Sequence, residues 1–377
     1  MKKLGLYLHI PFCEKKCDYC NFVSYCTSDD TKLLYVQNLM KEIVFQSQKF
    51  QDYEIDSIFI GGGTPSCLPI GSIFKILNTI YKNFKVLSTA EITIECNPNS
   101  LTISKLNEYK KANINRLSIG LQCYNDKLLK QIGRLHTKKD FDLAISRAKV
   151  FGFKNISVDL ILGVPNQKLR DVKKELKHLV KLGINHISSY GLIVEDNTLL
   201  KQKLDNGQYK LPSEDLQVKM YDFANKYLAK HGINRYEVSN FAKSSFESKH
   251  NTKYWTDQEY LGLGVVSSSY VDNKRWKSTD DLLTYHENIK QGKIEQLEVE
   301  ELDIDSKREE CIMLSLRTTK GINLTEFKQK YGFDLMHTKA EQIKKLLDGD
   351  FIKVQNNHLF CTEKGFKLLN QIILQLV

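Results

Sequence analysis

The sequence has no long hydrophobic run. None of its apolar stretches approaches the roughly 18 residues that suggest a membrane-spanning helix. The first ten residues resemble the opening of a signal peptide. However, the apolar part is short, His9 and Pro11 interrupt it, and no small-residue cleavage site follows. We therefore predict a first strand at residues 4–10. The nine cysteines, which lie outside any paired pattern, suggest a reducing cytoplasm.

The sequence also lacks the paired cysteine spacing of a structural zinc site. Three of its nine cysteines lie close together, as Cys13, Cys17 and Cys20 in the spacing C-x3-C-x2-C. Structural zinc sites need four ligands, usually from two C-x2-C halves, and no second half is present. An odd number of cysteines in a long chain without an export signal argues against a disulfide framework.

The sequence also lacks clusters of positive charge. The net charge of +10 comes mostly from dispersed lysines, and 41% of the 377 residues are apolar. A solvated lysine surface explains this charge better than nucleic-acid binding, so no nucleic-acid partner is expected. The length allows one large domain with a sizeable core and a small second domain.

What the sequence does have is three cysteines on one tight loop. Three thiolates can hold three irons of a cubane iron–sulfur cluster, which normally takes four cysteines. The fourth iron would then be open to a ligand other than cysteine. From spacing alone, an open-iron cluster is favoured, with zinc and disulfides as the alternatives.

The cysteines belong to a longer motif. It reads Tyr7-x-His9-Ile10-Pro11-Phe12-Cys13-x3-Cys17-x-Tyr19-Cys20. This motif resembles the signature of radical S-adenosylmethionine (SAM) proteins. Within them, it resembles the branch of oxygen-independent coproporphyrinogen III oxidase and its relative, the HemW-type haem chaperone. The resemblance implies a [4Fe–4S] cluster held by Cys13, Cys17 and Cys20, with exchangeable SAM at the open iron.

Strand-like and helix-like segments alternate along the first half of the chain. The apolar, strand-like runs are 4–10, 55–60, 91–95, 116–120, 156–162 and 186–192. Helix-like segments fall at 31–50, 70–84, 102–112, 138–151 and 169–182. Six β-then-α units predict an α/β fold with a parallel sheet, and the resemblance implies a partial (β/α)6 TIM-like barrel. Functional groups of such barrels lie at the carboxyl ends of the strands.

Candidate ligand residues follow these strands. The turn Gly61-Gly62-Gly63-Thr64-Pro65 either brings the backbone close to a ligand or is a tight βα turn. The resemblance assigns Gly62, Gly63 and Thr64 to the amino-acid end of SAM. Glu95 ends the third strand, where it is either a cap or a ligand of ribose hydroxyls. The resemblance favours the ribose role.

Five further residues enter the SAM site through the resemblance. It places Gln122, Arg134 and Asp159 in the pocket or beside it, and Tyr19 against the adenine; Tyr7 of the first motif completes the set. Asp159 interrupts an apolar strand, where a carboxylate is costly to bury without a partner. An ion pair with Arg134 is the structural alternative for Asp159.

A second motif, His250-Asn251-Thr252-Lys253-Tyr254-Trp255, resembles HemW-type proteins specifically. A histidine beside two aromatic rings could ligate haem or stack on a porphyrin, and the alternative is a lid that packs onto the barrel mouth. His250 is the candidate axial ligand, with Tyr254 and Trp255 as an apolar face. Ser268 stands where the family usually has histidine, which leaves a specialised paralogue open.

We divide the chain into a core barrel at 1–230, a lid region that extends it at 231–295, and a C-terminal domain at 296–377. The acidic segment 297–310 predicts a linker that runs into a helix. Helices at 324–331 and 338–347, strands at 351–354 and 358–361, and a helix from residue 364 predict a winged-helix-like α+β domain. Its candidate recognition helix has too few basic residues to argue for DNA binding.

The resemblance implies a haem chaperone. Such a protein carries the cluster and SAM, binds haem as cargo, and passes it to haem-accepting proteins, membrane-associated ones included, as a monomer or homodimer. The alternatives are a coproporphyrinogen III oxidase, which decarboxylates two propionates by radical hydrogen abstraction, and another radical SAM enzyme. The oxidases read C-x3-C-x2-C-x-C and have an extension before the signature. Here Phe22 replaces the last cysteine and six residues precede Tyr7, so oxidase activity is not expected.

Overall fold

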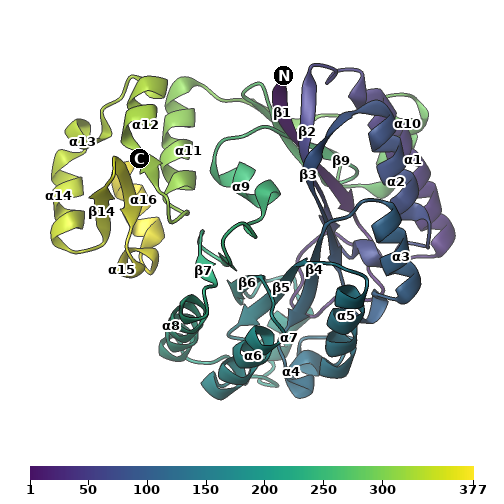
Figure 1. Ribbon diagram of the computed structural model, residues 1–377, viewed down its shortest axis with the longest axis horizontal. Helices are drawn as coiled ribbons and strands as arrows, with labels where there is room; N and C mark the ends of the chain where they lie inside the picture. The colour runs from purple at the N-terminus through teal and green to yellow at the C-terminus, as the bar shows by residue number, and fades with distance from the viewer.

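A curved, open sheet forms the centre of the protein (Figure 1), which we describe from a computed structural model of all 377 residues. Its twelve strands follow the order β12-β11-β10-β9-β1-β2-β3-β4-β5-β6-β8-β7. The strands from β9 to β6 in this order run parallel. The sheet ends in free edges instead of closing, so the predicted partial barrel is confirmed.

The six predicted β-then-α units are present. Their strands are β1 (Lys2–Ile10), β2 (Tyr53–Gly62), β3 (Lys85–Cys96), β4 (Arg116–Gln122), β5 (Asn155–Leu162) and β6 (His186–Gly191). Their helices are α1 (Asp29–Ser47), α2 (Ser72–Asn83), α3 (Ile103–Lys111), α4 (Asp126–Gln131), α5 (Lys138–Val150), α6 (Leu169–Lys181) and α8 (Glu214–Lys230). These helices cover the convex face of the sheet (Figure 1).

The two faces of each strand differ in chemistry because successive side chains point to opposite sides. On β4, Leu117, Ile119 and Leu121 join the main hydrophobic core beneath the helices. The alternate residues, such as Arg116 and Ser118, face the concave side. This concave side, which we call the lumen, is therefore largely polar, while the core lies between the sheet and the helices.

Six short strands extend the sheet beyond the six predicted units, and three short helices lie in the same part of the chain. They are α7 (Leu199–Asp205), β7 (Asn234–Arg235), β8 (Asn240–Ala242), α9 (Lys249–Trp255), β9 (Tyr260–Leu263), β10 (Ser268–Val271), β11 (Lys274–Lys277), α10 (Leu282–Lys290) and β12 (Leu297–Glu301). The predicted linker is wrong at its start, since residues 297–301 form β12 and pair antiparallel with β11. Opposite charges favour this pairing, with Lys274 Nζ 3.5 Å from Glu301 Oε2.

The C-terminal part has its own sheet, in the order β13-β15-β14. Its elements are α11 (Ile304–Ser315), β13 (Ile322–Asn323), α12 (Leu324–Tyr331), α13 (Leu335–Thr338), α14 (Ala340–Asp348), β14 (Ile352–Gln355), β15 (His358–Cys361), α15 (Glu363–Phe366) and α16 (Leu369–Leu376). Asn356 and Asn357, with φ of 49° and 62°, turn β14 into β15. A separate hydrophobic cluster between Ile312 and Leu376 holds this part together.

None of the helices combines the length and the apolar character that crossing a bilayer requires.

Candidate functional site

The loop after β1 carries the three motif cysteines, and we call residues 13–20 the cysteine loop. Its base is fixed by backbone hydrogen bonds. The Cys13 N–H donates to the Tyr25 carbonyl over 3.1 Å, and the Tyr25 N–H donates to the Pro11 carbonyl over 2.7 Å. Cys13, Cys17 and Cys20 are free thiols of intermediate exposure. The loop thus presents three unbonded sulfurs at the carboxyl end of β1.

Burial raises the pKa of the Cys13 and Cys20 thiols, and the negative charges of neighbouring thiolates raise them further. No three His, Cys, Asp or Glu side chains converge closely enough to hold one metal ion. A structural zinc site needs such convergence, with sulfurs about 2.3 Å from the ion. A cubane cluster distributes its thiolates over separate irons.

The glycine turn after β2 packs directly against the cysteine loop. The Gly63 N–H donates to the Ile10 carbonyl over 2.8 Å, and the Thr64 N–H to the Phe12 carbonyl over 2.7 Å. A Cβ on Gly63 would lie 2.6 Å from the Phe12 carbonyl oxygen and 3.0 Å from the Cys13 sulfur. Thr64 Oγ1 lies 3.5 Å from the same sulfur. The two motifs therefore form one surface, which requires glycine at 63.

His9 lies under this surface with one ring nitrogen unused. Its Nδ1 is hydrogen-bonded to the Tyr7 hydroxyl at 3.0 Å, while its buried Nε2 has no partner. Burial lowers the pKa of His9 to about 4, so the ring is neutral at pH 7. A Cβ on Gly62, whose φ is +113°, would collide with the ring. An unsatisfied buried nitrogen beside a glycine turn fits a site that receives a polar ligand.

Two buried carboxyl groups, Glu95 and Asp159, lie close enough for the charge of one to act on the other. Glu95 Oε2 accepts a hydrogen bond from the Gly62 N–H at 3.2 Å. Burial raises the pKa of Glu95 to about 8, and the Asp159 charge adds to the shift. Asp159 accepts from the Ser118 hydroxyl at 3.2 Å, and burial raises its pKa as well. Glu95 therefore lies near the end of β3, as the sequence predicted, and contacts the glycine turn.

The alternative ion pair between Arg134 and Asp159 is wrong. The guanidinium of Arg134 donates to Asn97 Oδ1 at 2.6 Å, to the Gly120 carbonyl at 2.8 Å and to the Cys17 sulfur at 3.5 Å. These acceptors lie nearer because Arg134 follows α4 at the carboxyl end of β4. Arg134 thus connects the cysteine loop to the ends of β3 and β4.

Two more predicted residues lie beside Arg134. A Cβ on Gly120 would lie 2.8 Å from Gln122 Nε2 and 3.3 Å from Arg134 Nη2, so the Gln122 side chain covers the same spot. Gln122 has a φ of +68°, which turns the chain at the end of β4. Tyr19 packs against a small hydrophobic cluster that includes Leu129 and Ile161. Gln122 and Tyr19 thus lie beside Arg134, while Tyr7 lies near the glycine turn through its hydrogen bond to His9.

Asn97 was not identified from the sequence. It accepts from Arg134 and donates to Thr64 Oγ1 over 3.2 Å, so it joins two candidate ligand segments. The available signal was its position, two residues after Glu95 and directly past the end of β3. Polar residues at that point of a barrel strand are candidates for a site.

The His250 motif lies deeper in the lumen, away from the cysteine loop. It forms α9, which Figure 1 shows on the inner side of the curved sheet. His250 is fully buried, with Nδ1 2.9 Å from the Ser57 hydroxyl and Nε2 2.9 Å from the Tyr254 hydroxyl. Its N–H donates to Glu91, which precedes Glu95 by four residues on the same face of β3. Burial lowers the pKa of His250 to about 3.

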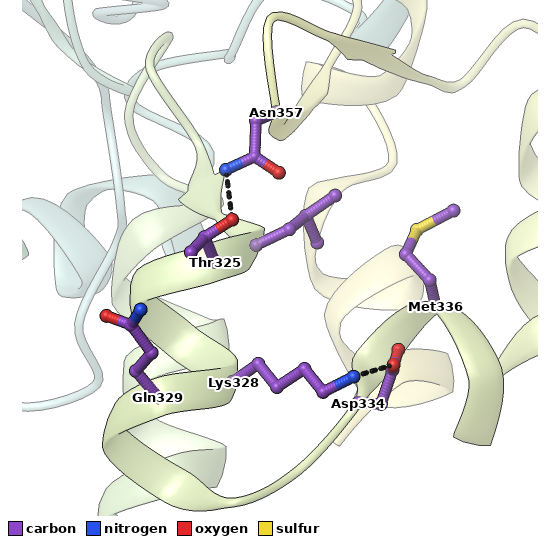
Figure 2. A pocket seen from close by; sticks show the side chains of 7 residues that line it. Thr325, Lys328, Gln329, Asp334, Met336 and Asn357 are labelled. Carbon is purple, nitrogen blue, oxygen red and sulfur yellow. Dashed lines mark hydrogen bonds and ion pairs between the residues drawn. The ribbon is translucent and has the colours of Figure 1, made fainter.

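Two cavities lie away from the cysteine loop, and the first of them borders the His250 motif. One of about 200 Å³ is lined by Tyr254 together with Tyr260, Tyr270 and Arg275. The other, of about 490 Å³, lies on the C-terminal domain. Figure 2 shows its walls, where Lys328 pairs with Asp334 and Asn357 bonds to Thr325. None of the candidate residues lines this second cavity.

Known proteins match this chain along nearly its whole length. The radical SAM superfamily model matches residues 7–188, and the HemN C-terminal domain model matches residues 302–368. Haem chaperone HemW of Bacillus subtilis is 34% identical, with 97% of each chain covered. Haem chaperone HemW of Lactococcus lactis subsp. lactis is also 34% identical, covering 98% of this chain and 96% of its own. The chain belongs to the HemW family.

The fold of this HemW-family chain also matches a solved structure. Coproporphyrinogen III oxidase (HemN) from Escherichia coli, a radical SAM enzyme, superposes with a TM-score of 0.88. The match covers 100% of this chain and 90% of the oxidase at 22% identity. The match confirms the radical SAM fold that the motifs predicted. At this sequence identity it supports the fold and not the function.

Proposed function

We propose that this HemW-family protein is a haem chaperone that carries a [4Fe–4S] cluster and SAM. The observation that carries the proposal is the direct packing of the cysteine loop against the glycine turn. Three free thiols lie there beside a glycine that leaves no room for a Cβ and an unpaired His9 nitrogen. The donor set fits an iron–sulfur cluster with an open position better than a closed structural site.

Each residue of the site has a proposed task. Cys13, Cys17 and Cys20 hold the cluster, and Gly62, Gly63 and Thr64 bind the amino-acid end of SAM. Glu95 binds the ribose hydroxyls, and Tyr19 lies along the adenine. Tyr7, Gln122, Arg134 and Asp159 line the remaining walls. The bound cofactors supply one-electron chemistry, while the protein supplies orientation and an environment with little water.

Phe22 favours the chaperone over the oxidase. It stands where the oxidases have a fourth cysteine, and its side chain is 68% exposed. The curated relatives named above carry the name haem chaperone, and their similarity extends through both parts of the chain. Transfer to haem-accepting proteins, some at membranes, a cytoplasmic location and a monomeric or dimeric state are parts of the same proposal.

We retain His250, Tyr254 and Trp255 as the proposed haem contacts, under one geometric condition. Both ring nitrogens of His250 are engaged, so one of the hydrogen bonds to Ser57 and Tyr254 must break before iron can bind. Movement of α9 out of the lumen would satisfy this condition. Exposed His231 offers a matched control for a histidine substitution.

The test combines haem binding with an enzyme assay. Haem added to the anaerobic protein should give a shifted Soret band, and His250→Ala should change it while His231→Ala should not. Incubation with coproporphyrinogen III, SAM and a reductant should give no protoporphyrinogen. Turnover in that assay would move the protein to the oxidase class, and an unchanged Soret band in His250→Ala would remove His250 as the haem ligand.

A further inference from the structure

One buried carboxylate of the cysteine loop has no task in the site described above. Asp18 lies between Cys17 and Tyr19, and its side chain is only 4% exposed. Its Oδ2 lies 2.6 Å from Nζ of Lys203, on α7. A buried carboxylate is costly without a partner of opposite charge, so Lys203 compensates a charge that the loop carries.

The main chain at Asp18 is also held on both sides. Its N–H donates to the Ile132 carbonyl over 3.1 Å, and its carbonyl accepts from the Leu200 N–H over 2.7 Å. Ile132 directly follows α4, and Leu200 lies in the first turn of α7. The adjacent Gly133 has a φ of +76°, and a Cβ there would collide with Asp18 Oδ1. Two elements from distant parts of the sequence therefore meet at this one residue.

The neighbours of Asp18 differ in how they are held. The Cys17 sulfur accepts a long hydrogen bond from Arg134, at 3.5 Å, and the Cys17 carbonyl accepts one from the Cys20 N–H over 3.1 Å, within the loop itself. Tyr19 makes hydrophobic contacts. The preceding residues 14–16 are exposed. In the middle of the loop, Asp18 thus combines a short ion pair with backbone hydrogen bonds from both its N–H and its carbonyl. Lys203 is accessible enough to be changed with little damage to packing, since its side chain is 26% exposed.

We propose that Asp18 and Lys203 form a clamp through which α7 positions the cysteine loop to retain its cluster. The inference rests on the proposed function, because the clamp serves the cluster ligands Cys17 and Cys20. Neither Asp18 nor Lys203 is a ligand, so both are positioning residues. Outer residues that orient metal ligands typically change metal affinity by roughly 10–100-fold when they are lost.

The test compares two lysines of the same helix. Lys203→Met removes the clamp, whereas Lys201→Met removes the exposed pair with Asp205, which has no contact with the loop. After anaerobic reconstitution and exposure to air, the visible absorbance of the cluster should decay at least about threefold faster in Lys203→Met. Lys201→Met should match the unmodified protein, and Lys203→Arg, which keeps the charge, should restore most of the lifetime.

A second readout uses the protein without its cluster. Iodoacetamide should label Cys17 and Cys20 faster in Lys203→Met, as followed by mass spectrometry, while exposed Cys26 reports unchanged reagent access. If Lys203→Met folds poorly, Asp18→Asn removes the same charge pair and should give the same pattern. Equal lifetimes and equal labelling in Lys203→Met and the unmodified protein would overturn the clamp, as would equal effects of both lysine variants. Faster labelling in a protein that loads no cluster would support the clamp and refute the cluster.

Discussion

At the scale of single residues, the candidate site consists of polar groups held away from water. Their positions after successive strands bring them to one end of the barrel, as the motifs predicted, while their roles stay a prediction. Their partners could not be predicted in the same way. Arg134 bonds to Asn97 and Gly120 instead of Asp159, since the choice among nearby acceptors depends on a turn geometry that the sequence pattern does not specify.

The first prediction concerns the cluster ligands. Cys17→Ala should abolish iron loading and the brown colour, because two thiolates cannot hold a cubane that normally takes four. Cys26→Ala, at an exposed cysteine outside the loop, is the control and should load iron normally. Iron and sulfide analysis after anaerobic reconstitution measures both. Full iron content in Cys17→Ala would disprove the assignment of this ligand.

The second prediction concerns Glu95. Glu95→Ala should weaken SAM binding by about 1–3 kcal/mol, because the ribose hydroxyls would lose a buried acceptor. Glu54→Ala, which removes a carboxylate paired with exposed Lys85, should leave the affinity unchanged. Equilibrium dialysis against labelled SAM gives both values. Identical affinities in the two variants would exclude Glu95 from the site.

The third prediction follows from the raised pKa of Glu95. In the folded protein its pKa is about 8, against an ordinary value near 4.3 in an unfolded chain. Between these values the folded state binds one more proton than the unfolded state, so Glu95 makes stability fall as pH rises. Glu95→Gln should therefore lose less thermal stability between about pH 6 and pH 8.5 than the unmodified protein without cofactors. An equal loss in both proteins would show that Glu95 is already ionised.

At the scale of elements, the sequence predicted long segments well and short ones poorly. The periodic segments that became α1, α6 and β5 were found within a few residues of their ends. Strands β7 to β12 have two to five residues each, too few for an apolar pattern. They join the parallel strands through pairings of β9 with β1 and of β8 with β6, which lie far apart in sequence. The position of α9 inside the lumen depends on contacts with Ser57 and Glu91 that no local pattern reveals.

The fourth prediction tests the contact between the glycine turn after β2 and the chain that follows β1. Gly63→Ala should destabilise the protein by about 1–3 kcal/mol and reduce cluster retention, because its Cβ would overlap the Phe12 carbonyl oxygen. A Cβ added to Gly191, at the end of β6, would meet no atom within 4 Å, so Gly191→Ala is the matched control. Thermal unfolding followed by circular dichroism compares the two. Equal unfolding midpoints in the two variants would mean that this contact accommodates a methyl group at position 63.

At the scale of the whole molecule, two hydrophobic clusters are joined by polar contacts. Arg235 on β7 has a side chain that is 2% exposed and pairs with Glu363 of the C-terminal domain. Its guanidinium also stacks on Phe366 at 4.3 Å and donates to the Tyr221 hydroxyl at 2.8 Å. The two-part composition was visible in the sequence. The contacts of Arg235 with Glu363 and Phe366 were not, because they join residues more than a hundred positions apart. The domain boundaries at 230 and 295 stay a prediction.

The fifth prediction tests this junction. Arg235→Met should weaken docking of the C-terminal domain by about 1.5–3 kcal/mol, the usual range for hydrogen bonds to a charged group. Lys367→Met, which removes a more exposed pair with Asp222, should have a much smaller effect. Limited proteolysis between β12 and α11 reports the docking. If both variants are cleaved at the same rate as the unmodified protein, Arg235 does not hold the two parts together.

The central claim is that three cysteines hold a cluster whose remaining iron position is open to SAM. Electron paramagnetic resonance of the reconstituted, reduced protein tests it most directly, with spectra recorded before and after SAM is added. We predict a [4Fe–4S] signal that changes when SAM binds, and that changes less at the same SAM concentration in Glu95→Ala. A protein that shows no such signal, or a signal that saturating SAM leaves unchanged, would contradict the account.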